Sequence, residues 1–220
     1  MTAGLAARPV PRAAVTAATD RLLLCGVVAG PLFIVAATAH ALLRPGFDVV
    51  HHPLSLLSTG GLGWIQIATF VVSGLLFLAC AVGLRRVLRG SRGGTWGPWL
   101  IGVFAVLVVA GGVFVADPAL GFPPGTPPGR PAEFSWHGIL HAIAPVAAFA
   151  ALSAAGLVFA RRAAVLGQGG WAVVSVTVAV AVQALGMWSN VTWNFIPLGA
   201  AVVLGFGWAS AQAARIRAGS

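Results

Sequence analysis

The chain has 220 residues, of which 59% are hydrophobic and only 8% are charged. Because soluble domains carry about 25% charged residues, this composition excludes an ordinary soluble protein, and the length allows one compact domain. The net charge of +9 could indicate nucleic-acid binding. The arginines, however, are scattered between apolar runs, as in proteins whose positive charges anchor them in a membrane, so no nucleic-acid partner is predicted.

The N-terminal residues 1–19 are polar and contain proline and arginine, which predicts a disordered cytoplasmic tail. Six apolar runs follow, each close to the ~20 residues that a membrane-spanning helix needs. We therefore predict an all-α, polytopic membrane protein whose six-helix bundle occupies residues 20–214 and has the lipid bilayer as its environment. The predicted spans are approximately residues 22–43, 63–84, 99–116, 136–160, 171–189 and 195–213.

The first apolar run has a second interpretation. Ala39-His40-Ala41 at its end resembles a small-residue cleavage site of a signal peptide. The run is longer than the ~7–15 residues of a signal core, which favours an uncleaved helix.

Arginines lie mainly on one side of the predicted membrane. Eleven of the 13 share that side, and only Arg44 and Arg130 lie opposite. The positive-inside rule makes the arginine-rich side cytoplasmic, which puts both termini inside and the loops 44–62 and 117–135 outside. The eight tryptophans lie near helix ends, as interfacial belts do. A chain without lysine and rich in Ala, Gly and Arg is typical of a GC-rich bacterium, so we predict the bacterial inner membrane.

Small residues four positions apart predict close helix packing. Gly26 and Gly30 form a GxxxG pair in the first span. Gln183, inside the fifth span, is expected to make an interhelical hydrogen bond. Cys25 and Cys80 lie in apolar surroundings and outside any CxxC pair, so neither a disulfide nor a thiol-bound metal is predicted.

All five histidines and three of the four acidic residues lie on the predicted outer side. Nothing in membrane insertion requires histidines there, and ionisable groups at a membrane edge often mark function. His137 and His141 are four residues apart on one helix and share a face. We predict that they form a pocket with His40 and Asp117, covered by the 44–62 loop. The predicted catalytic residues are Asp48, His51, Asp117, His137 and His141, with His52 as an alternative to His51.

Imidazole and carboxylate groups suit zinc, so His40, Asp117, His137 and His141 are candidate zinc ligands. A metal-free pocket, in which Asp48 or Asp117 fixes a histidine tautomer, is an alternative. Three functions remain open. The first is a membrane-embedded enzyme, hydrolase-like and metal-assisted or acid–base, with a lipid or isoprenoid substrate. The others are a non-catalytic accessory or envelope sensor protein and a small-molecule transporter.

Several short segments form a distinctive set. They are Gly30-Pro31, Arg44-Pro45-Gly46-Phe47-Asp48 with His51 and His52, Leu54–Ser58, Gly63-Trp64, Asp117-Pro118 and His137–His141. Together these segments resemble a bacterial membrane family known as domain of unknown function 998. The resemblance covers nearly the whole chain and implies a six-helix membrane fold with a polar outer face, but no activity.

The chain is also similar, more weakly, to membrane hydrolases of the alkaline ceramidase and progestin-adipoQ receptor type. Those proteins combine a serine, an aspartate and an HxxxH pair around zinc. The resemblance therefore implies these roles for Ser55, Asp117, His137 and His141. Those proteins have seven helices and carry HxxxH on the last one, so the likeness serves as an analogy.

Overall fold

Six long helices form the part of the chain that the computed structural model describes, residues 16–131 and 133–219. All six are long and apolar enough to cross a membrane. Within the described residues the only strand-like pairing is one isolated bridge, between Ala119 and Phe122. The protein is therefore an all-α integral membrane protein, as predicted. Its helices are α1 (Ala17–Leu43), α2 (Gly63–Val87), α3 (Trp96–Val113), α4 (Trp136–Val165), α5 (Gly169–Thr192) and α6 (Ile196–Gly219), with a short 3-10 helix, η1 (Leu54–Ser58), between α1 and α2.

Most helix boundaries differ by a few residues from the sequence-based ranges, and two of these differences have a clear local cause. The predicted tail extended to residue 19, whereas α1 begins at Ala17, because the Thr16 hydroxyl accepts a hydrogen bond from the backbone N–H of Thr19 and caps the helix. Residues 1–15 of that tail lie outside the described residues. Helix α3 begins three residues earlier than predicted, with Pro98 in its first turn, where the missing N–H of proline costs nothing.

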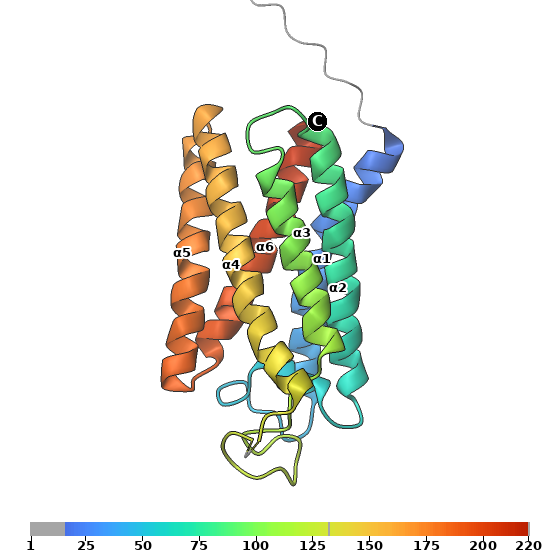
Figure 1. Cartoon of the computed structure of the whole chain (residues 1–220), viewed down its shortest axis with the longest axis vertical. Coiled ribbons are helices and arrows are strands. Elements are labelled where there is room, and N and C mark those ends of the chain that lie inside the picture. The colour runs from blue at the N-terminus through green and yellow to red at the C-terminus, as the bar shows by residue number, and fades with distance from the viewer. Residues whose placement is uncertain (1–15, 132, 220) are drawn as a thin grey trace, which may run out of the picture.

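The six helices form a closed ring in chain order. Each helix packs against the next one, and α6 returns to pack against α1. In Figure 1, α6 crosses the bundle diagonally and ends near the start of α1. There Arg217 of α6 forms two hydrogen bonds with the Asp20 carboxylate of α1, at 2.7 and 2.9 Å. The first and last described residues therefore lie at the same end of the bundle.

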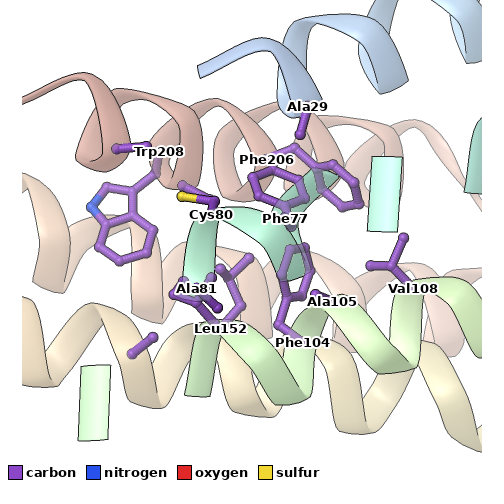
Figure 2. Close-up of a cluster of buried hydrophobic side chains, with 14 of the residues drawn as sticks. Ala29, Phe77, Cys80, Ala81, Phe104, Ala105, Val108, Leu152, Phe206 and Trp208 are labelled. Carbon is purple, nitrogen blue, oxygen red and sulfur yellow. The ribbon is translucent and has the colours of Figure 1, made fainter. Parts of the chain in front are cut away.

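The core is a cluster of aromatic rings at the centre of this ring of helices (Figure 2). Phe77, Phe104 and Phe206 pack edge to face with ring centroids 5.2 to 5.7 Å apart. Such geometries are favoured by the ring quadrupoles. Cys80 packs in the same cluster as a free thiol.

Small residues bring α1 and α6 into close contact around Gly26, Gly30 and Ser210. The Ser210 hydroxyl of α6 accepts a hydrogen bond from Gly30 N–H and donates one to the Gly26 carbonyl. A Cβ atom at Gly30 would collide with the backbone of Phe206 and with Ser210. The predicted GxxxG packing is confirmed, and so is the interhelical bond of Gln183, whose amide donates to Ser153 of α4 at 3.0 Å.

Candidate functional site

The two ends of the bundle differ in composition. One end carries all five histidines together with the segments 44–62 and 114–135, which lie at the bottom of Figure 1. We call it the histidine-bearing end. The opposite end carries the α2–α3 and α4–α5 connections and the C-terminal part of α6, with most of the arginines, and we call it the arginine-rich end.

A cavity of about 290 Å³ lies inside the histidine-bearing end, between α1, α3, α4 and α6. Aromatic side chains of the core, among them Phe33 and Phe206, line its inner part, and residues of the 44–62 segment, which we call the roof segment, cover it. The lining is almost entirely apolar. Its polar side chains are Thr38, His52, Ser55 and His141. Small-molecule sites are typically apolar cavities of roughly 300–1,000 Å³ with a few placed polar groups, and this cavity lies at the lower end of that range.

The cavity opens laterally between α1 and α6. These helices touch closely where Gly30 meets Ser210, but nearer the histidine-bearing end their side chains line open space. Leu42 of α1 and Ile196 and Val203 of α6 line the cavity and are also 75%, 51% and 49% exposed on the outside of the bundle. In a bilayer this opening faces the lipid.

His52 fixes the roof segment in place. Its Nδ1 accepts the backbone N–H of Asp48 at 2.9 Å, and its Nε2 lies 2.9 Å from the carbonyl oxygen of Leu120. Since a peptide N–H can only donate and a carbonyl can only accept, the ring is neutral with its proton on Nε2. A further bond, from Phe195 N–H to the Val50 carbonyl at 2.8 Å, ties the roof segment to the start of α6.

The HxxxH pair of α4 faces the end of α3. His141 Nδ1 donates to the Phe114 carbonyl at 2.7 Å, and His137 Nδ1 donates to the Val115 carbonyl at 2.8 Å. These carbonyls follow the last turn of α3, where backbone acceptors lack intrahelical partners. The two imidazoles share a face, as predicted, and both hold Nδ1 protonated. In the neutral form of each ring, Nε2 is then an acceptor, and that of His141 is buried without a partner.

Asp117 caps α4. It lies beyond the end of α3 rather than at it, and its two carboxylate oxygens accept from the hydroxyl and the backbone N–H of Ser135, at 2.6 and 3.0 Å. The Ser135 hydroxyl in turn accepts from Gly138 N–H at 3.0 Å. A negative charge at a helix N-terminus is stabilised by the helix dipole. Gly138 is needed here, because a Cβ atom would collide with the Asp117 carboxylate.

Asp48 and His51 form an exposed pair on the roof segment. His51 Nδ1 lies 2.7 Å from Asp48 Oδ2, and the side chains are 69% and 50% exposed, respectively. The hydrogen bonds from His51 and from Val50 N–H lower the pKa of Asp48 below its ordinary value of 3.8. Neither side chain lines the cavity.

His40 lies on α1 beside Gln66 of α2. Both side chains are buried, and no polar atom of either has a partner with hydrogen-bond geometry. His40 therefore occupies the α1–α2 interface, and it does not line the cavity.

The proposed zinc ligands do not fit a metal ion. Among the described residues, no group of three or more His, Cys, Asp or Glu side chains could hold one. Asp117 is bound to Ser135 and His40 faces Gln66, so neither side chain joins the histidine pair of α4 as a third ligand.

Of the predicted catalytic residues, only His141 lines the cavity. His52, which was predicted as the alternative to His51, also lines it. The 44–62 loop was predicted to cover a pocket of His40, Asp117, His137 and His141, but the cavity that it covers has only His141 of these four in its lining. Sequence reasoning missed the apolar lining itself, because a phenylalanine facing a cavity has the same helical pattern as one facing the core.

Comparison with known proteins identifies the family to which the chain belongs. The family described as "Protein of unknown function (DUF998)" matches residues 27–214. No curated protein and no solved structure matches the chain. The match spans four of the six helices completely and most of α1 and α6, which agrees with the resemblance found in the sequence. This integral membrane protein therefore belongs to the DUF998 family.

Proposed function

We propose that the protein binds the apolar chain of a lipid or an isoprenoid in the cavity between α1 and α6. The observation that carries the proposal is the lateral opening at Leu42, Ile196 and Val203, which joins an apolar cavity to the outside of the bundle. Such an opening admits a chain directly from the bilayer, without passage through water.

An unfilled apolar cavity of this size is unfavourable. At about 24 cal/mol for each Å³ left empty, the cavity would cost up to about 7 kcal/mol. A lipid chain that fills it recovers the missing dispersion contacts. The net gain is smaller than this upper limit, because a chain that leaves the bilayer gives up similar contacts there.

The polar groups near the roof segment indicate which part of the ligand lies there. His141 contributes to the lining, and its Nε2 is an acceptor without a partner. A hydroxyl group on the ligand would donate to this nitrogen and satisfy it. The ligand class is therefore an amphipathic molecule with one apolar chain and a hydroxyl-bearing end, held with its polar end under the roof segment.

The orientation is part of the proposal. We place the histidine-bearing end outside and both termini in the cytoplasm of a bacterium, because the arginine-rich end carries the charges that the positive-inside rule retains inside. Single-cysteine labelling in a Cys25→Ser/Cys80→Ser background tests this. Labelling of Arg92→Cys by a membrane-impermeant reagent in intact cells would overturn the orientation.

An enzymatic role is a second candidate, and it has one observation in its favour. Ser55 and His141 both line the cavity, and His141 Nε2 is free to take a proton from a ligand or from water there. In such an enzyme, the roles of the other predicted catalytic residues would be structural only: Asp48, His51, Asp117 and His137. Loss of turnover in His141→Gln, with lipid binding retained, would support this role. Among the described residues, no feature specifically favours an accessory protein or a transporter.

Lipid extraction tests the binding proposal. Protein purified in a mild detergent is expected to retain an amphipathic lipid near one per chain, measured by extraction and mass spectrometry. Added geranylgeraniol or oleyl alcohol should displace it and raise the thermal midpoint of unfolding. Protein that retains no lipid and whose midpoint does not respond to either probe would refute the proposal.

A further inference from the structure

A second cavity, of about 660 Å³, lies at the arginine-rich end. Helices α1, α2, α4, α5 and α6 contribute to its lining. Three arginines line it, Arg86, Arg162 and Arg215, and no acidic residue among those described does. Glutamine, serine and threonine side chains supply the remaining polar groups. This cavity is thus basic, whereas the one at the histidine-bearing end is apolar.

Two of the arginines are held on the cavity wall by specific contacts. Arg162 Nη1 donates to the Ser91 hydroxyl at 2.9 Å and to the Arg92 carbonyl at 2.8 Å. The guanidinium of Arg215 stacks on the Trp171 ring at 4.6 Å. The positive-inside rule requires positive charge on one side of the membrane, but it does not require guanidinium groups fixed around a cavity.

The N-terminus of α5 lies at the edge of the same cavity. Gln168, its N-cap residue, and Trp171 in its first turn both line the cavity, and no side chain caps this helix end. Gly169 and Gly170 lie between them, and a side chain added at either would meet nothing within 4 Å. Uncapped N–H groups in open space at a helix N-terminus attract anions.

We propose that this cavity binds a phosphate group, carried either by a lipid head group of the adjacent leaflet or by a soluble molecule. Guanidinium groups match phosphate oxygens in geometry and charge. The positive charges of three arginines around one cavity repel one another, and a bound anion would reduce this repulsion. The volume of about 660 Å³ leaves room for a molecule larger than a bare phosphate ion. This site is separate from the proposed lipid-chain cavity and does not depend on it.

Four charge-neutralising variants of the full chain test the site. Arg86→Gln and Arg215→Gln remove a cavity arginine, whereas Arg89→Gln and Arg161→Gln remove the same charge at the same end outside the lining. Arg162 is left intact because it also holds Ser91 and the Arg92 carbonyl. The thermal midpoint of each variant shows that it folds.

Each variant is titrated in dodecyl maltoside, which contains no phosphate. Inorganic pyrophosphate, followed by calorimetry, is the soluble probe, and phosphatidylglycerol, followed by native mass spectrometry, is the lipid probe. We expect at least one probe to bind, about ten-fold more weakly in the two cavity variants and less than about two-fold more weakly in the two controls. Pyrophosphate binding identifies a soluble ligand, and binding of phosphatidylglycerol alone identifies a head group. Equal losses in all four variants, or no binding of either probe to the unmodified protein, would overturn the site.

Discussion

Filling the apolar cavity with a protein side chain should reduce lipid binding. Gly199 of α6 lines the cavity, and a Cβ atom added there would meet nothing within 4 Å. Gly199→Phe can therefore place a ring in open space without displacing the backbone. Gly207, in the same helix, also has nothing within 4 Å of an added Cβ and does not line the cavity. Gly207→Phe is thus the matched control.

The size of the effect depends on where the ligand goes when it leaves the cavity. A ring that displaces about four methylene groups of the ligand would cost roughly 3 kcal/mol of binding if those groups returned to water. They return to detergent or lipid, which is as apolar as the cavity lining, so only the packing contacts are lost. We therefore expect a loss on the order of 1 kcal/mol, which is a five- to ten-fold weaker affinity.

The assay compares the two variants directly. Both are purified in the same detergent, their retained lipid is extracted and quantified by mass spectrometry, and geranylgeraniol is titrated while the thermal midpoint is recorded. Gly199→Phe should retain several-fold less lipid and respond less to the probe, and Gly207→Phe should match the unmodified protein. If the two variants retain the same amount of lipid and respond equally to the probe, the ligand does not bind in this cavity.

Three further predictions concern the histidine-bearing end. His52→Ala leaves a partly buried donor and acceptor unpaired, so we expect a loss of about 1–2 kcal/mol in unfolding free energy and faster hydrogen exchange in the roof segment, whereas exposed His51→Ala should stay within about 0.5 kcal/mol. Ser135→Ala removes the N-cap of α4 and should cost about 1–2 kcal/mol in the same unfolding measurement; an unchanged free energy would contradict the capping role. The lowered pKa of Asp48 means that its ionised form stabilises the fold above pH 3.8 and that this contribution is lost as pH falls through the lowered pKa. The thermal midpoint of the unmodified protein should therefore exceed that of Asp48→Asn at neutral pH and converge with it in acid, and a difference that persists in acid would refute this.

The helices could be predicted from the sequence because the length and apolarity of each run leave a bilayer-spanning helix as the main solution. Their ends could not, because they depend on single contacts. Helix α1 begins early because Thr16 caps it. Helix α3 ends at Val113, and the histidines of α4 bind the carbonyls that follow.

The histidine-bearing end was predicted in its composition but only partly in its connections. The spacing of His137 and His141 predicts a shared face correctly, but their partners are backbone carbonyls, which no side-chain pattern reveals. Asp117 was expected beside the histidines and instead binds Ser135, because a serine at a helix start offers both a hydroxyl and an N–H. The lateral opening was not predicted, since Leu42 has the same pattern as any lipid-facing residue.

The most direct test of the lipid-binding proposal is a structure of the full chain in lipid nanodiscs, determined by electron cryomicroscopy with a bound antibody fragment. The account predicts elongated density between α1 and α6, with one end against Phe33 and Phe206 and the other beside His141 under the roof segment. A cavity closed by side chains, or one occupied by water alone, would contradict it.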